Sequence, residues 1–280
     1  MYLLRKMVLA GLLFSAGVNM FAQESAYAYD ANGNLTKDLN KNIVDIQYNS
    51  LNLPSRIVFK NGDNISHVYS ADGSKLRTVR VADGDTLTTD YCGNVIYENG
   101  VPVRLMTDVG YIALSDTSYH YFIKDHQGNV RVVADEHGNA EEVNDYYPFG
   151  GLMSTSSRQS VQPYKYNGKE LETACGVNWY DYGARRYDPV LGRWNGVDPL
   201  CEDYYSENPY GYCGNNPVNY VDPNGLMKVL YNPDGTYKET THNNWFHNTF
   251  MGRQEYIDYG DRKVHLSESE FWQWQRSGRV

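Results

Sequence analysis

Three aspartates that each precede a proline are the residues best suited to chemistry in this sequence. They are Asp188, Asp198 and Asp222, and Arg185 and Arg186 lie just before the first of them. Two carboxylates held close together share one proton, so one can activate water while the other protonates a carbonyl oxygen or a leaving amine. Such crowding drives their pKa values apart. A second interpretation is open, because Asp before Pro is also a common start of a turn.

Histidine and cysteine spacing argues against a metal site. His126 and His137 each lie in a turn beside a glycine, where a solvated histidine is expected. The four cysteines include no C-x-x-C pair. His242 and His247 are five residues apart, which is not the i, i+4 spacing of a helical metal pair. The sequence also lacks a phosphate-binding loop, a nucleophile elbow and a dinucleotide fingerprint, so no cofactor is predicted.

Turns and short strands would position the three aspartates. Residues 164–226 contain Asp-Pro three times and Asn-Pro twice, and each pair favours a turn. Short aromatic runs between these turns are typical of strands. The whole chain has 26 Tyr and 14% aromatic residues, which fit a half-buried pleated surface. We therefore predict a mainly β fold.

Repeated hairpin units precede this stretch. The units begin at Tyr29, Tyr48 and Tyr69, which are 19 and 21 residues apart. Each unit contains a Gly or Asn turn and an alternating run such as SRIVF, a pattern typical of hairpins. Asn99-Gly100 continues the series as a further turn. The prediction is a curved sheet of stacked antiparallel hairpins.

Residues 164–226 also carry the motifs of a known family. These are YNGKELE, GVNWYDYGARRYDP, GRW followed by VDP, and NPYGYCGNNPVNYVDPNGL. The stretch resembles the RHS-repeat-associated core domain found towards the C-terminal end of RHS and YD-repeat proteins. The hairpin units resemble degenerate YD repeats, and KDHQGNVR and YYPFG resemble the segment that leads into such cores. The chain thus resembles a short secreted member of this polymorphic-toxin and ABC-toxin-related family.

The resemblance implies a specific reaction. In some relatives the core is an aspartyl self-protease that cuts its own chain just after a D-P-x-G-L motif. The motif here is DPNGL (222–226), so the implied scissile bond joins Leu226 to Met227. The three Asp-Pro aspartates named above are the candidate acids, with Arg185 or Arg186 as the charge partner. Self-cleavage and a purely structural role in turns both stay open.

Residues 1–22 have the features of a cleaved targeting segment. Arg5 and Lys6 precede an apolar run, and cleavage is predicted after Ala22. A retained N-terminal anchor is the alternative, because Met20 is larger than the cleavage rule prefers. No later stretch is apolar over a length that spans a membrane. We expect an exported protein (periplasmic, at the cell surface or extracellular) with no membrane span after signal removal.

Export would place Cys92, Cys175, Cys201 and Cys213 in an oxidising space. Cys201 and Cys213 are twelve residues apart and flanked by turns, so they can close a small loop. Buried, unpaired thiols are the alternative.

The sequence divides into five segments. They are a signal peptide (1–22), degenerate YD-repeat hairpins (23–150), an exposed Ser- and Gln-rich loop (151–163), the RHS core (164–226) and a variable C-terminal extension (227–280). In the extension, residues 229–231 and 237–240 predict a hairpin, and Ser267 with Glu270 predicts a short capped helix. The extension is either a small toxin that uses its histidines, His265 among them, or a segment that packs its aromatic side chains on the sheet or on a partner.

Three functions are compatible with these features. The first is an exported RHS-core protein that acts as a structural or presentation module in bacterial interaction or a toxin system, with self-cleavage after Leu226 as a hypothesis. The second is a YD-repeat module that binds a surface glycan or another cell-envelope component without catalysis. The third is a carrier of a small C-terminal toxin, with a cognate immunity protein as its partner. A net charge of −9 argues against broad nucleic-acid binding by the core.

Overall fold

The structure is a computed structural model that describes residues 25–157, 161–203, 206–226, 228–231, 237–240, 256–258 and 263–265. Strands dominate this part of the chain, and its helical segments are 3-10 turns of three or four residues. The predicted mainly β fold is therefore confirmed. The expected signal peptide and the expected helix after Ser267 lie outside the described residues.

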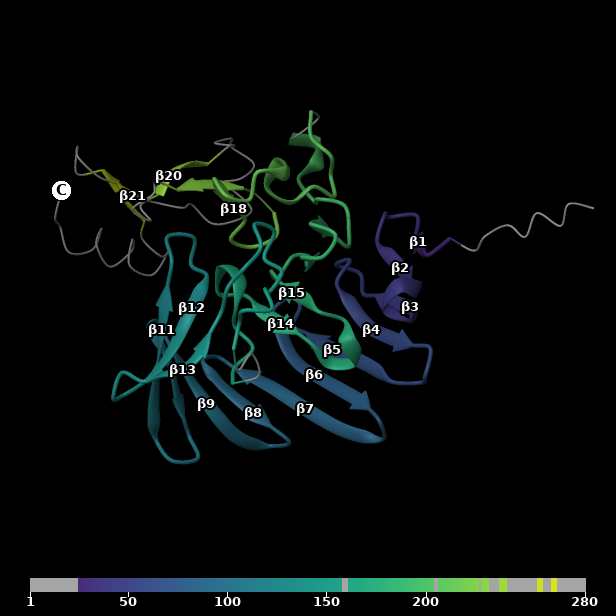
Figure 1. The fold of residues 1–280 in the computed structure, drawn as a ribbon. Coiled ribbons are helices and arrows are strands. Elements are labelled where there is room, and N and C mark those ends of the chain that lie inside the picture. Colours follow the sequence, from purple (N-terminus) through teal and green to yellow (C-terminus); the bar gives the residue numbers. More distant parts are fainter. Residues whose placement is uncertain are drawn as a thin grey trace, which may run out of the picture.

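A 13-stranded antiparallel sheet forms the larger part of the molecule, with its strands in sequence order (Figure 1). The strands are β1 (Tyr27–Tyr29), β2 (Leu35–Asp38), β3 (Ile43–Tyr48), β4 (Pro54–Phe59), β5 (Asn64–Tyr69), β6 (Lys75–Ala82), β7 (Asp85–Cys92), β8 (Val95–Glu98), β9 (Val101–Thr107), β10 (Gly110–Ala113), β11 (Ser118–Lys124), β12 (Val130–Asp135) and β13 (Ala140–Val143). This order follows from the hairpin units of the sequence, because each strand pairs with the next one along the chain. The turn between β8 and β9 is an example: Asn99 and Gly100 have φ angles of 49° and 80°, as the favoured two-residue hairpin turn requires.

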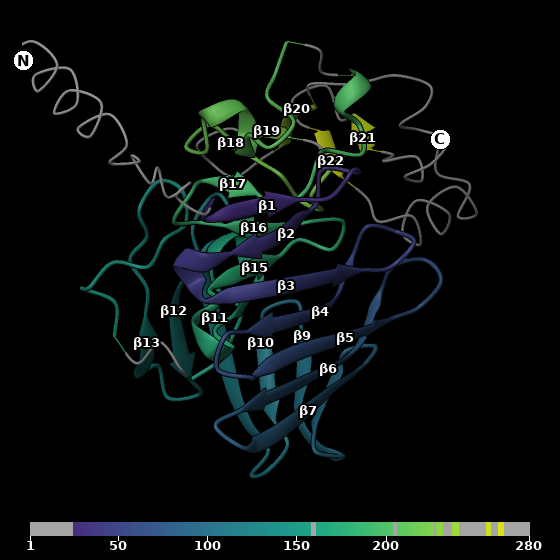
Figure 2. The same ribbon diagram turned by 90° about the vertical axis from the view of Figure 1, so that its right-hand side faces the viewer.

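The sheet curves around a second, smaller sheet, which the ribbon shows on the concave side in both views (Figures 1 and 2). The smaller sheet contains β14 (Glu170–Glu172), β15 (Trp179–Asp181), β16 (Arg186–Asp188) and β17 (Arg193–Trp194). One hydrophobic cluster joins the two sheets. It contains Leu35, Ile43, Ile46, Ile57, Phe59, Ile65, Val177 and Trp179. Alternation along β4 and β5 supplies its side chains from one face of the large sheet.

Tyrosine rings make most of the second cluster, inside the Tyr- and Gly-rich stretch. It contains Tyr166, Leu171, Tyr180, Tyr182, Tyr187, Trp194, Tyr212 and Cys213. The ring centroids of Tyr187 and Tyr212 are 4.3 Å apart. The buried hydroxyls find partners: those of Tyr182 and Tyr212 each donate to Oδ1 of Asn167 at 2.7 Å. Buried tyrosines are stable here because each polar tip is hydrogen-bonded.

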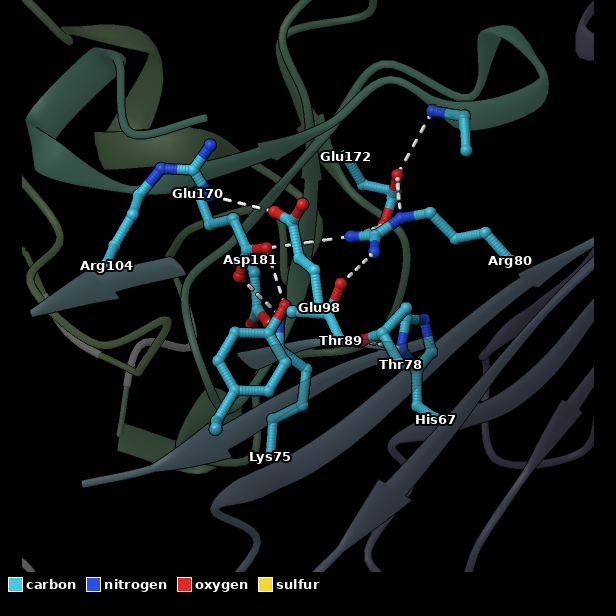
Figure 3. A network of polar contacts seen from close by, with 12 residues as sticks. His67, Lys75, Thr78, Arg80, Thr89, Glu98, Arg104, Glu170, Glu172 and Asp181 are labelled. Carbon is cyan, nitrogen blue, oxygen red and sulfur yellow. Dashed lines mark hydrogen bonds and ion pairs between the residues drawn. The ribbon is translucent and has the colours of Figure 1, made fainter. Parts of the chain in front are cut away.

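Ion pairs fix the small sheet to the large one, as Figure 3 shows. Lys75 of β6 lies 2.7 Å from Glu170 and 2.6 Å from Asp181. Arg80, also of β6, lies 2.6 Å from Glu172. These side chains are at most 16% exposed, so the pairs are largely shielded from water. They connect strand β6 of the large sheet to β14 and β15 of the small one.

The segment between the sheets differs from the predicted exposed loop. Gln162 is only 2% exposed. Its side-chain amide donates to Glu142 at 3.1 Å, and Lys165 donates to the same carboxylate at 2.5 Å. A Gln in a polar stretch gives no sign of burial by itself. The buried carboxyl group of Glu142 needs hydrogen-bond donors, and Gln162 in this segment is one of them.

Two further small sheets involve the end of the chain. One contains β18 (Tyr220–Val221), β19 (Val229–Tyr231) and β20 (Tyr237–Thr240), and the other contains β21 (Tyr256–Asp258) and β22 (Lys263–His265). Antiparallel pairing of β19 with β20 confirms the predicted hairpin. Within the described ranges, no helix has the length and apolar character needed to cross a membrane.

Candidate acid pocket

Arg185 lies at the centre of a buried pocket in the core. It immediately precedes β16 and is 6% exposed. Its Nη2 atom donates to Oδ2 of Asp198 at 2.8 Å and lies 3.6 Å from Oδ2 of Asp222. The guanidinium also lies over the ring of Trp194, 4.2 Å from its centroid. Two of the three predicted aspartates thus meet at one arginine.

Asp198 lies in a turn of the core and its side chain is 16% exposed. Its Oδ1 atom accepts a hydrogen bond from the backbone N–H of Leu200 at 2.8 Å. Burial raises the pKa of Asp198, although the charge of Arg185 opposes the shift. One carboxylate oxygen of Asp198 thus accepts a hydrogen bond within the turn, and the other accepts one from Arg185.

Asp222 directly follows β18 and is 3% exposed. Its Oδ1 atom accepts backbone N–H groups from Asn224 at 3.1 Å, from Gly225 at 2.7 Å and from Leu226 at 3.2 Å. Burial raises the pKa of Asp222 to about 6, against the opposing effects of Arg185 and the backbone donors. Asp222 is thus both the start of a tight turn and an acid that holds its proton at mildly acidic pH.

Arg185 also binds the backbone of the turn that Asp222 begins. Its Nε atom donates to the carbonyl of Gly225 at 2.5 Å, and its Nη1 atom donates to the carbonyl of Pro209 at 3.2 Å. Gly225 has a φ of +81°, and a Cβ there would lie 3.0 Å from the backbone nitrogen of Arg185. The close approach therefore requires glycine. Gly225, the residue before Leu226, is thus bonded to Asp222 through its N–H and to Arg185 through its carbonyl, while Met227 lies outside the described residues.

Asp188 belongs to a different environment. It is 1% exposed, and its Oδ2 atom accepts from Nε1 of Trp179 at 3.1 Å and lies 3.3 Å from Nζ of Lys41. Its Oδ1 atom accepts from the backbone of Val190 at 2.9 Å. Arg186 does not line the pocket either. It pairs with Asp181 instead. Of the residues suggested by the sequence, the structure brings together Arg185, Asp198 and Asp222.

A cavity of about 30 Å³ lies between these groups, enough for about one water molecule. Its lining adds residues that the sequence did not suggest as site residues, namely Glu207 and Lys228. No motif or spacing links these two to the acids, so only the fold reveals them. Cys201 and Cys213 line the same cavity, and both thiols are free. Cys213 is buried, as the unpaired alternative predicts.

Comparison with known proteins gives several partial matches. No protein-family model matches the chain. It is 30% identical over 233 residues to Salivary gland surface protein 1 of Aedes aegypti, which covers 74% of this chain and 7% of that protein. It is 36% identical over 99 residues to Toxin subunit YenC2 of Yersinia entomophaga, covering 34% of this chain and 10% of that subunit. It is 25% identical over 217 residues to the tRNA3(Ser)-specific nuclease WapA of Bacillus spizizenii, covering 72% and 9%.

Solved structures share the fold. The crystal structure of TcdB2-TccC3 has a TM-score of 0.57 and 22% identity, and the match covers 71% of this chain and 11% of that chain. The Photorhabdus luminescens Tc holotoxin pore has a TM-score of 0.60 and 21% identity, with 75% and 11% covered. The chain thus spans about a tenth of the length of these proteins. The chain therefore has the fold of a part of these Tc-toxin structures, and its sequence is similar to segments of toxin subunits such as YenC2.

Proposed function

We propose that this protein is an exported structural and presentation module of a toxin system whose core cuts its own chain after Leu226. The observation that carries the self-cleavage proposal is the contact of Arg185 with both Asp198 and Asp222, beside the turn that ends at Leu226. Two carboxylates around one guanidinium suit acid–base chemistry on a nearby peptide bond. The proposal of export is based on the signal peptide predicted for residues 1–22, and it applies to the chain that remains after this peptide is removed.

The two acids take complementary roles in this proposal. Asp222, whose pKa is raised to about 6, donates its proton to the carbonyl oxygen of Leu226 as water attacks, and it takes a proton back from the resulting diol when the C–N bond breaks. Asp198 is the general base that takes a proton from the attacking water and then passes it to the leaving amine of Met227. Water adds across the C–N bond, which leaves a carboxyl group on Leu226 and a free amine on Met227. Arg185 stabilises the charge on Asp198 and positions the turn through the Gly225 carbonyl.

The test is the intact mass of refolded residues 23–280 beside an Asp198→Asn variant. Wild type should separate into two fragments between Leu226 and Met227, while the variant should stay whole. An Asp188→Asn variant serves as a matched control, because Asp188 is also buried and also precedes proline but does not touch Arg185. If wild type stays whole under folding conditions, self-cleavage is rejected for this chain.

The released segment 227–280 would then be the effector or its remnant. We propose that the core presents it, and that a cognate immunity protein is its partner if it is toxic. Expression of residues 227–280 alone in a bacterial host checks this: growth arrest supports a toxin, and normal growth supports a packing extension.

A second candidate function is binding to a surface glycan. Tyr119 and Tyr121 lie two residues apart on β11, are 45% and 42% exposed, and share one face of the strand. Exposed aromatic rings are the platforms on which sugars stack. Among the described tyrosines of residues 164–226, by contrast, Tyr166, Tyr180, Tyr182, Tyr187 and Tyr212 are buried and cannot serve this purpose. A Tyr119→Ala, Tyr121→Ala double variant should lose retention on immobilised cell-envelope polysaccharide if this function is present.

A further inference from the structure

Lys228 is the second residue after the proposed scissile bond, and it is held by a defined set of contacts. Its Nζ atom forms an ion pair with Oε1 of Glu207. The same nitrogen lies over the ring of Tyr220, 5.4 Å from its centroid. The side chain of Lys228 is only 15% exposed and that of Glu207 is 34% exposed. Lys228 is thus the more buried partner, while Glu207 reaches it from an exposed position.

The ion pair between Glu207 and Lys228 packs against Gly214. The φ of this glycine is +59°, and a Cβ on it would lie 2.9 Å from Nζ of Lys228 and 3.2 Å from Oε2 of Glu207. The two charged groups thus pack directly against the backbone of Gly214. Both also line the cavity that contains Asp198 and Asp222. The ion pair is part of the wall of the acid pocket.

The backbone on both sides of the proposed bond is also fixed. Tyr220 pairs with Leu230 and Val221 with Val229 in the antiparallel pair β18–β19. In the sequence, the Leu226–Met227 bond lies between these two paired strands. Asp222 holds the first half of this connection through three backbone N–H groups. The Lys228 side chain is a corresponding anchor on the second half.

We propose that the Glu207–Lys228 ion pair is a clamp that positions the Leu226–Met227 bond against Asp198 and Asp222. This inference rests on the proposed self-cleavage, and it names a further contact on which the rate of that cleavage depends. Glu207 is a positioning residue, because it touches Lys228 and not the reacting atoms. Efficient cleavage therefore requires opposite charges at positions 207 and 228, and Glu207 is the group that selects a cation at position 228.

The kinetic test follows cleavage of the whole refolded chain by mass. A small displacement of a reacting bond slows a reaction strongly, so Glu207→Gln should lower the first-order rate about tenfold. Glu202→Gln is the matched control, since Glu202 is exposed five residues earlier and does not line the cavity. Exchanging the charges, with Glu207→Lys and Lys228→Glu together, should restore the rate to within about threefold of wild type. A Glu207→Gln rate equal to wild type, or no recovery on charge exchange, overturns the clamp.

A second measurement does not depend on cleavage. In an Asp198→Asn background the bond stays intact, so amide hydrogen exchange of residues 226–231 reports how tightly the connection is held. Adding Glu207→Gln should speed this exchange about tenfold, whereas adding Glu202→Gln should leave it unchanged. If wild type does not cleave but exchange responds, self-cleavage fails and the clamp remains as a structural contact. If wild type cleaves but neither rate nor exchange responds to Glu207→Gln, the clamp fails and self-cleavage stands.

Discussion

Arg185 and Arg186 are adjacent in the chain, yet their side chains join two separate networks. Arg185 pairs with Asp198 and contacts Asp222 in the acid pocket. Arg186 pairs with Asp181 and donates to the hydroxyl of Tyr69 at 3.0 Å, so it belongs to the contact between the core and the large sheet. Successive side chains at a strand point to opposite faces, and this places one arginine at the candidate site and the other at the support of the site.

Because the two arginines join separate networks, Arg185→Lys and Arg186→Lys should change the rate of self-cleavage differently. Arg185→Lys keeps a positive charge but loses the forked geometry that reaches Asp198, Pro209 and Gly225 at once. We expect self-cleavage to slow by about 100-fold, the scale seen when one oriented donor is removed from an active site. The measurement is the rate at which the intact mass disappears after refolding.

Arg186→Lys is the control for that change. It alters the contact with Asp181 and Tyr69 but not the pocket, so the cleavage rate should stay near that of wild type. If both variants lost the same fraction of the cleavage rate, the cause would be general destabilisation of the fold, and the role given to the Arg185 contacts would be refuted.

Self-cleavage should depend on pH in a defined direction. The proposed role of Asp222 requires its neutral form, and burial raises its pKa to about 6. The rate should therefore fall as pH rises through about 6. At lower pH it should fall again as Asp198, the proposed base, takes up a proton. Cleavage rates between pH 4 and 9 would give a bell-shaped profile, and a rate that keeps rising up to pH 9 would contradict these roles.

Loss of Lys75 should weaken the attachment of the core to the sheet. Lys75→Met removes the cation that lies 2.7 Å from Glu170 and 2.6 Å from Asp181, and leaves only the Arg80 contact at 3.7 Å and the Arg186 pair to these largely buried carboxylates. Breaking a buried ion pair on one side typically costs about 3 kcal/mol, and the free energy of unfolding in urea should fall by about that amount. Arg77→Met is the control on the same strand, because Arg77 is 51% exposed where it pairs with Asp90. This control should show no measurable change, and equal losses for both variants would refute the role given to Lys75.

His67 should make the protein less stable in weak acid. Its ring is buried on the concave face, with Nδ1 3.1 Å from Oγ1 of Thr78. Burial, followed by the charges of Arg186, Lys75 and Arg80, lowers its pKa well below 6.5. The unfolded chain therefore binds a proton that the folded chain excludes, and stability is lost as pH falls below about 6.5, by up to about 1.4 kcal/mol per pH unit.

The matched measurement compares wild type with His67→Gln by urea unfolding at pH 7 and pH 5.5. The variant has no proton to take up at this position, so its stability should change less between the two pH values. An unchanged difference between pH 7 and pH 5.5 would mean that His67 does not contribute to this pH dependence.

Local features of the sequence predicted the hairpins well. Turn residues such as Asn99-Gly100 and alternating side chains along β4 and β5 act between neighbours in the chain, so they can be recognised without knowing the fold. The sequence did not predict that Gln162 is buried, because that depends on Glu142, twenty residues away. Nor did it show that the core lies inside the curve of the sheet (Figure 2).

For the candidate site, the sequence by itself determined the residue types: aspartates that can both start turns and act as acids, two arginines just before the first of these aspartates, and the DPNGL turn. Only the tertiary structure decided which aspartates meet. Asp198 and Asp222 reach Arg185, while Asp188 faces Lys41 and Trp179. The physical reason is that turn chemistry is local, whereas a shared guanidinium, burial and the resulting rise in pKa come from packing between segments that are distant in the chain.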